Sequence, residues 1–359
     1  MKKNTLLTIA AIAVAAVIIF VLYQVLREIP FMAPAKEAVP AGHKVIGVVY
    51  PQQLKEAVTG LEQGLAEIGY TNISYEYVET QSGPTLSADI VKATKAFAEK
   101  NVDLIFASGD SHSKAAVEAT KELESAIPIV FLTHFRDPIK HGVIQSFKSS
   151  GNNATGVASD IVEVVQKQIE FLKRINPDGK KIGIFTDGFA VPAVGEAVLA
   201  EFRVQAPRFG YTVIEYKTSV PPPQAEKAWY EIAGNIKPGD IDALFHIAGH
   251  YFQLQETAEG ELANRLKIPL VGPLEDLPNG GHFGYSNNFI TSGKQAARLV
   301  DKIFRGEKPT NIPVEFTENT LVVYVDRARE SDFTFPESML SFAEIRTGDA
   351  RPWERILGR

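Results

Sequence analysis

The sequence predicts an α/β fold made of two similar lobes, and three observations indicate it. Short apolar runs alternate with amphipathic segments, which is typical of parallel, doubly wound sheets. The alternation runs once as far as Asp160 and then starts again. The chain has 359 residues, of which 45% are hydrophobic and 22% are charged. A globular chain of that length suits about two domains.

The first predicted strand, at 44–50, is apolar throughout, which indicates burial on both faces of a parallel sheet. The helix after it has apolar residues on one stripe between Leu54 and Ile68, and Gly69 ends it. The remaining elements of this half are a strand at 73–78, a helix at 85–99, a strand at 102–107, a helix to about Leu123 and a strand at 129–132.

The segment 127–160 connects the two alternations. It begins as a buried strand, opens into a polar and aromatic tip at 133–138, and ends in a second apolar step at 155–158. We interpret it as the end of one lobe, part of a ligand cleft and the first crossing of a hinge. Asp137 precedes a proline, and we expect it to cap backbone amides in a turn.

The second half repeats the rhythm of the first. A helix at 162–175 comes first, and the predicted strands follow at 181–185, 211–216, 243–247 and 268–271. Further helices lie between these strands. A segment at 282–286 crosses back, a helix follows at 289–304, and late strands at 314–316 and 321–325 close the body. Ligands of open α/β sheets bind beyond the carboxyl ends of the strands, so we expect these ends to face a shared cleft.

The N-terminus predicts a membrane anchor. Lys2 and Lys3 precede an uncharged, apolar run at 4–26, which is long enough to span a bilayer. The run therefore indicates a retained signal-anchor, with the body on the extracytoplasmic face. The alternative is a cleaved signal peptide, since Ala33-Pro34-Ala35 resembles a small-x-small cleavage site; the body would then be periplasmic or secreted.

Charge and composition exclude several classes of protein. The net charge of −6 argues against a nucleic-acid partner. The absence of cysteine excludes disulfides, thiolate metal sites and a cysteine nucleophile. His246 and His250 are four residues apart on a strand and its tip, where that spacing does not place them on one face. We therefore expect no metal, no cofactor and no enzymatic activity.

A family resemblance is carried by an ordered series of segments. They are IPIVF at 127–131 with Asp137-Pro138, GNNATGV at 151–157, GKQAA at 293–297, IFRGEKP at 303–309, IPV at 312–314 and FPES at 335–338. The chain resembles the type I periplasmic substrate-binding proteins of ABC transporters, in the group that includes binders of tryptophan and other aromatic amino acids. The resemblance covers about residues 44 to 345.

The resemblance implies two Rossmann-like lobes joined by three crossovers that close on a small solute. The predicted domains are a signal-anchor at 1–27, a tether at 28–42, lobe 1 at 43–155 plus 286–312, lobe 2 at 156–285 plus 313–346, and a tail at 347–359. The implied function is capture of a solute, with an amino acid favoured, and its delivery to an ABC permease. A membrane-tethered sensor is the alternative within binding proteins.

The candidate ligand-binding residues are those at the tips that follow the strands. Arg136 could hold a ligand carboxylate in a bidentate pair, and aromatic tips could enclose a flat ligand. The full set is Tyr50, Gln52, Ser108, Asp110, Ser111, Thr133, His134, Phe135, Arg136, Asp160, Asp187, Phe189, His250, Tyr251, Glu275 and Asp276.

One motif favours a different class of function. Gly109-Asp110-Ser111 resembles the motif of GDSL hydrolases, in which the serine is the nucleophile. That chemistry needs a histidine positioned by an acid late in the chain. The last histidine is His282, and no Asp-x-x-His follows it. The alternative for the serine is capping of the next helix, so hydrolysis is the weaker hypothesis.

Overall fold

The computed structural model describes residues 39–352 except 41, 82–84, 135, 188–191, 219–224, 248–251, 275–276 and 350. The predicted anchor at 1–27 and most of the tether lie outside the described residues. No helix in the described part of the chain is long and apolar enough to cross a membrane. Residues 39–359 belong to one compact unit, which contains both lobes.

The first sheet is the parallel sheet that the sequence predicts. Its order is β11-β5-β4-β3-β1-β2, and every neighbouring pair is parallel. Its strands are β1 (Lys44–Pro51), β2 (Ile73–Thr80), β3 (Leu104–Ser108), β4 (Ile129–Thr133), β5 (Ala154–Ala158) and β11 (Glu315–Phe316). Strands β3, β4 and β5 are buried along their whole length, which explains their continuous apolar sequence.

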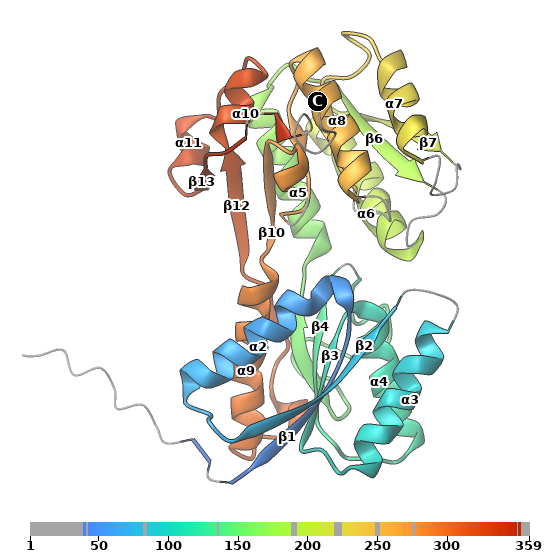
Figure 1. The fold of residues 1–359 in the computed structure, drawn as a ribbon, viewed down its shortest axis with the longest axis vertical. Helices are drawn as coiled ribbons and strands as arrows, with labels where there is room; N and C mark the ends of the chain where they lie inside the picture. The colour runs from blue at the N-terminus through green and yellow to red at the C-terminus, as the bar shows by residue number, and fades with distance from the viewer. Residues whose placement is uncertain are drawn as a thin grey trace, which may run out of the picture. The chain divides into compact units, whose positions relative to one another are not determined.

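Helices cover both faces of this sheet, as Figure 1 shows. On one face lie α2 (Lys55–Ile68), after the short η1 (Gln52–Leu54), and α9 (Phe289–Phe304). On the other lie α3 (Leu86–Glu99) and α4 (Asp110–Glu122). Helices α2 and α9 approach closely: a Cβ on Gly60 would lie 2.1 Å from the Ile290 carbonyl oxygen, and a Cβ on Gly293 2.1 Å from that of Ala57. This contact requires glycine at both positions. We call this sheet and its helices lobe 1.

The second sheet, with its helices, forms lobe 2. Its order is β13-β12-β10-β9-β8-β6-β7. The strands are β6 (Lys181–Asp187), β7 (Thr212–Thr218), β8 (Ala243–Phe245), β9 (Leu270–Val271), β10 (Phe283–Asn287), β12 (Asn319–Tyr324) and β13 (Glu344–Arg346). The prediction of an all-parallel sheet is wrong at one pair, because β10 and β12 are antiparallel. Since β12 follows a crossing rather than a helix, nothing forces it to run parallel.

Helices also cover both faces of the second sheet. One face packs against α5 (Ile161–Ile175) and α6 (Pro192–Gln205), and α6 continues into η2 (Ala206–Phe209). The other packs against α7 (Ala225–Asn235) and α8 (Phe252–Leu266). The small elements η4 (Leu277–Asn279), η5 (Pro309–Asn311), α10 (Val325–Glu330) and α11 (Glu337–Leu340) complete the described fold.

The chain passes between the sheets after β5, β10 and β11. The predicted lobe boundaries at 156, 286 and 313 fall inside or just before these strands, so the crossings themselves lie a few residues later. In the first crossing the Ser159 amide still donates to the Thr133 carbonyl of lobe 1, at 3.0 Å. The next residue, Asp160, already caps α5 of lobe 2, with its carboxylate 3.1 Å from the amides of Val162 and Glu163.

The third crossing is held by a side chain of lobe 1. The Gln295 amide of α9 donates to the Phe316 carbonyl at 3.1 Å, and its oxygen accepts from the Glu318 amide at 3.0 Å. One residue later, Asn319 donates to the Glu163 carboxylate of α5 at 2.9 Å. The backbone of the first and third crossings is therefore fixed on both sides, which leaves short segments there for a hinge motion.

Candidate functional site

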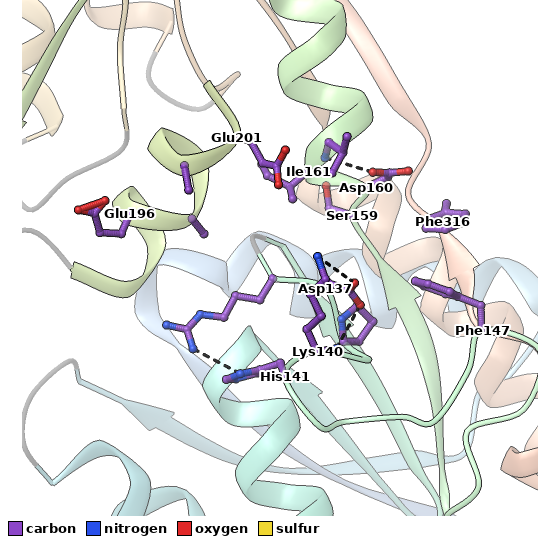
Figure 2. Close-up of a pocket in the computed structure, with 15 residues that line it drawn as sticks. Asp137, Lys140, His141, Phe147, Ser159, Asp160, Ile161, Glu196, Glu201 and Phe316 are labelled. Atoms are coloured by element: carbon purple, nitrogen blue, oxygen red, sulfur yellow. Dashed lines mark hydrogen bonds and ion pairs between the residues drawn. The ribbon is translucent and has the colours of Figure 1, made fainter. Parts of the chain in front are cut away.

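A cavity of about 670 Å³ is lined by residues from both lobes. Lobe 1 contributes the segment after β4 together with Phe147 and Phe316, and lobe 2 contributes one face of α6. The first crossing, at 159–162, also lines it. Figure 2 shows Glu196 and Glu201 on α6, with Asp137 and His141 on the other side. A cavity of this size can hold a small solute.

Arg136 lines this cavity with a partly buried side chain, and a hydrogen bond fixes its backbone. Its amide donates to the Asp110 carboxylate at 3.2 Å. Its guanidinium has one polar neighbour, Nδ1 of His141 at 3.3 Å, and no carboxylate among the described residues. Burial, with Arg136 as the next cause, lowers the pKa of His141, so that ring stays neutral beside the guanidinium. The guanidinium is therefore available to an anionic ligand group.

The acidic residues of the cavity differ in what they already bind. Asp137 accepts from the Ile139 amide at 2.8 Å, which confirms the predicted turn. Asp160 is occupied as the cap of α5. Glu196 pairs with Arg203, with Oε2 and Nη1 3.5 Å apart. Glu201 also lies on α6, and within the described residues its carboxylate has no ion pair or hydrogen bond.

Two aromatic side chains line the same cavity. The rings of Phe147 and Phe316 have centroids 4.7 Å apart and planes inclined by 39°. Phe316 is 50% exposed, although β11 pairs with the buried strand β5. Ala197 and Ala200 on α6 add short side chains to the lining. The cavity thus combines charged groups with apolar surface, as ligand sites commonly do.

A smaller cavity of about 50 Å³ shares two lining residues, Ser159 and Ile161, with the larger one. His134 and Phe289 line it from lobe 1, with their rings 4.9 Å apart in an edge-to-face contact. Complete burial lowers the pKa of His134 to about 3, so the imidazole is neutral. Its backbone amide donates to Asp110 at 3.3 Å, which ties the end of β4 to the start of α4.

Comparison with known proteins identifies the family. Residues 44–346 match the model of a family described as ABC transporter substrate binding protein. The chain belongs to this family. No curated protein matches the chain. The resemblance seen in the sequence is thereby confirmed.

Solved structures of other proteins share the fold. An ABC domain from Streptococcus pneumoniae in complex with L-Trp is 20% identical, with a TM-score of 0.67, covering 85% of this chain and 100% of that one. A ligand-free, open substrate binding protein with adhesive properties from Clostridium difficile is 21% identical, with a TM-score of 0.67 and coverage of 85% and 100%. A conserved domain protein from Vibrio cholerae is 23% identical, with a TM-score of 0.66 and coverage of 86% and 100%.

In this substrate-binding protein, three of the predicted ligand residues line a cavity. Arg136 and Asp160 line the larger one and His134 the smaller one. The other described candidates of lobe 1 lie at the strand ends but line neither cavity: Tyr50, Gln52, Ser108, Asp110, Ser111 and Thr133. Their role in binding stays a prediction.

The remaining candidates depend on tips that the structure does not describe. Phe135, Phe189, His250, Tyr251, Glu275 and Asp276 lie outside the described residues, and Asp187 is the last residue of β6. The residues that sequence reasoning missed are Glu201, Phe147 and Phe316. A charged residue within α6 and an aromatic within a loop give no local signal, because only the tertiary fold brings them to the cavity.

The environment of Ser111 disfavours the hydrolase hypothesis. Ser111 is exposed in the first turn of α4, and the helix cap is Gly109, with φ of 110°. The adjacent His112 is buried and its Nε2 lies 2.7 Å from the Thr80 hydroxyl. His282 lies in lobe 2, where its ring accepts from the Leu270 amide and contacts the Ser331 hydroxyl at 2.9 Å. Each of these two histidines thus has a structural role.

Proposed function

We propose that this substrate-binding protein captures an amino acid on the extracytoplasmic side of the membrane and delivers it to an ABC permease. The family supports solute binding of this kind. The observation that carries the choice of ligand is Arg136, a partly buried guanidinium that lines a cavity of about 670 Å³ without a carboxylate partner in the described structure. The α-carboxylate of an amino acid would supply the anionic partner of this guanidinium.

The Arg136 site is preorganised. Asp110 holds its amide, and the neutral His141 ring contacts its guanidinium. A bidentate pair with a carboxylate would use donors that at present have at most one protein partner. Because the backbone is already ordered, binding costs little additional conformational entropy there.

Glu201 supplies the complementary charge. It lines the same cavity from lobe 2, on one face of α6 with Ala197 and Ala200. Its carboxylate would accept hydrogen bonds from the ligand ammonium. One charged group thus comes from each lobe, and we propose that a zwitterion contacts both once the lobes close on it. A ligand of this kind stabilises the closed arrangement of the lobes and shifts the population toward it.

The predicted tips would add further contacts on closure. The described ones are Tyr50, Gln52, Ser108, Asp110, Ser111 and Thr133, and we retain them as proposals together with the tips outside the described residues. The apolar run at 4–26 would hold the protein at the outer face of the membrane, close to its permease. Mass spectrometry of the membrane fraction tests this: a mature chain that starts near Lys36 contradicts retention of the anchor.

Calorimetric titration of the purified protein tests the ligand class. The ligands are L-tryptophan, the amine that lacks its carboxylate and the acid that lacks its ammonium, followed by the other amino acids. We expect L-tryptophan, or another amino acid, to bind best, and both truncated compounds to bind more weakly.

A pair of variants tests the site itself. Arg136→Ala is expected to weaken amino-acid binding by about 10- to 100-fold, because a hydrogen-bonded charge contact contributes roughly 1.5–3 kcal/mol. Lys140→Ala is the matched control: Lys140 lines the same cavity, but its side chain is 82% exposed and faces Asp137. Equal effects of the two variants, or wild-type protein that binds sugars and no amino acid, would contradict the proposal.

A further inference from the structure

One carboxylate, that of Glu163, bonds to residues beside all three crossings between the lobes. Glu163 lies in the first turn of α5, directly after the first crossing, and its amide donates to the Asp160 carboxylate at 3.1 Å. Its side chain accepts from the Tyr285 hydroxyl at 2.9 Å and from the Asn319 side-chain amide at 2.9 Å. Tyr285 belongs to β10, which leads into the second crossing, and Asn319 is the first residue of β12, which follows the third. Glu163 thus joins the lobe 2 ends of the three crossings.

Both donors to Glu163 are themselves held in place. Burial, followed by the hydrogen bond to Glu163, raises the pKa of Tyr285 to about 12, so its hydroxyl remains a donor at neutral pH. The backbone carbonyl of Tyr285 accepts from Gln168, a buried side chain further along α5, at 3.0 Å. The side-chain oxygen of Asn319 accepts from the Thr317 hydroxyl at 3.2 Å, which turns its amide group toward Glu163. The contacts of the carboxylate are therefore part of a fixed network.

Lobe 1 holds the third crossing with a side chain of its own. Gln295 of α9 is 2% exposed and bonds to the Phe316 carbonyl and the Glu318 amide. The next residue, Asn319, bonds to Glu163 of lobe 2. The chain therefore passes from a contact with lobe 1 to a contact with lobe 2 within one residue.

The other two crossings are equally short. In the first, the Ser159 amide donates to the Thr133 carbonyl of lobe 1, and the next residue, Asp160, caps α5 of lobe 2. In the second, Asn287 is the last residue of β10 in lobe 2, and Asn288 caps α9 of lobe 1. Each crossing thus leaves about one peptide for movement, and a bond between the ends of the crossings limits how independently these peptides move.

We propose that Glu163 is a positioning residue that makes the three crossings move together, so that the lobes turn about one axis. Without this carboxylate each crossing can bend or twist by itself, and the lobes sample more arrangements. A ligand that contacts both lobes then removes more conformational entropy when it binds. The role of Glu163 concerns the motion of the lobes and holds for any solute that the cavity takes.

Distances between labels on the two lobes test this role. The chain has no cysteine, so Lys121→Cys in α4 and Glu231→Cys in α7, both at exposed positions, attach one spin label to each lobe. Pulsed electron spin resonance then gives the width of the distance distribution in the absence of ligand. Glu163→Ala should broaden this distribution. Glu163→Gln should keep the wild-type width, because its amide can accept from Asn319 and donate to the Tyr285 hydroxyl.

Glu170→Ala is the matched control on the same helix. Glu170 pairs with Lys167 at 3.0 Å and with Arg174, and both ion pairs stay within α5. Its loss should leave the width unchanged. Tyr285→Phe removes one of the two donors to Glu163 and keeps the ring, so it should broaden the distribution by less than Glu163→Ala does.

Hydrogen exchange of the unlabelled proteins gives a second readout. In Glu163→Ala the amides at 283–287 and 319–321 should exchange about tenfold faster, as expected for the loss of one hydrogen bond to a charged group. The amides of β6 at 181–185, in the same sheet, should exchange as in the wild type.

The width decides between the outcomes. Equal widths in Glu163→Ala and the wild type overturn the proposal, and so does equal broadening by Glu170→Ala or by Glu163→Gln. If Glu163→Ala does not fold, Tyr285→Phe decides, and a wild-type width in that variant overturns the proposal. Since no ligand is present, the result is independent of the proposed function. A protein that binds no amino acid but shows the expected widths loses its proposed ligand and keeps the role of Glu163.

Discussion

Two neighbouring regions, the carboxyl ends of β3 and β4 and the lining of the large cavity, use polar residues in opposite ways. Around the ends of β3 and β4, several polar groups are bonded within the chain: Asp110 accepts from the amides of His134 and Arg136, and His112 contacts Thr80. The buried hydroxyls of Ser108 and Thr133 at the same ends have no hydrogen-bond partner in the described structure. In the large cavity, Arg136 and Glu201 have no ionic partner in the described structure. The first region is built to hold a shape, and the second is built to receive a ligand.

This difference follows from what burial costs. A buried polar group without a partner loses its hydration and gains nothing, so groups such as Asp110 must be paired inside the fold. A charged group at the wall of a cavity stays hydrated until a ligand replaces the water. We call the hydrogen-bonded groups around Asp110 and His112 the paired region, and the cavity-lining charges Arg136 and Glu201 the wall. The paired region should therefore determine the stability of the fold, and the wall should determine the affinity for a ligand.

The largest effect is expected from Asp110→Ala. It leaves the amides of His134 and Arg136 without their acceptor in a buried setting, so the free energy of unfolding should fall by about 3 kcal/mol. Amino-acid affinity should fall as well, because Arg136 loses its fixed position. Urea unfolding and calorimetric titration measure the two quantities.

The neighbouring Ser111 is the control for this variant. Ser111 is exposed in the same helical turn, so Ser111→Ala should change the unfolding free energy by less than about 0.5 kcal/mol. If Asp110→Ala were as stable as Ser111→Ala, the paired region would not be the stabilising one.

The second prediction concerns pH. Burial lowers the pKa of His112 to about 4 and those of His134 and His282 to about 3. An unfolded histidine titrates near 6.5, so between about pH 6.5 and 4 the unfolded chain binds more protons than the folded one. Stability is therefore complete above about pH 6.5 and declines as the pH falls, by at most about 1.4 kcal/mol per pH unit for each histidine.

Unfolding curves at about pH 7.5 and 5.5 measure this decline. His112→Gln should make it shallower, since one of the buried rings is then absent. Affinity should change by less than about twofold over the same range, because arginine does not titrate there. If the free energy of unfolding stayed constant with pH while ligand affinity fell, the roles assigned to the paired region and the wall would be reversed.

Much of the fold follows from local patterns. The helix predicted at 289–304 is α9 (Phe289–Phe304), because its apolar stripe and the Asn288 cap are local signals. The strands at 44–50 and 129–132 were predictable from apolar runs. The antiparallel β10–β12 pair, α10, α11 and β13 were not, because short elements near the C-terminus depend on packing against lobe 2.

The candidate site was predictable only where it coincides with a strand end. Arg136 lies in the tip just beyond the end of β4 (Ile129–Thr133), so the rule that ligands bind beyond strand ends finds it. Glu201 lies within α6, and the local sequence around it does not distinguish it from a solvated glutamate on any helix. Phe316 belongs to a strand of two residues, and its exposure appears only in the assembled fold. Tertiary contact, rather than local propensity, makes these residues part of the cavity lining.

The smallest effect is expected from Glu201→Gln, and it tests the wall from the side of lobe 2. Loss of one partly exposed charge contact should weaken amino-acid binding by about two- to fivefold, since such pairs contribute roughly 0.2–1 kcal/mol. Glu196→Gln is the matched control on the same helix, because Glu196 already pairs with Arg203 and should contribute less. Binding of the ligand analogue without an ammonium should be equal in Glu201→Gln and the wild type. If that analogue is also weakened, Glu201 acts on the shape of the cavity and not on the ligand charge, and the wall would resemble the paired region after all.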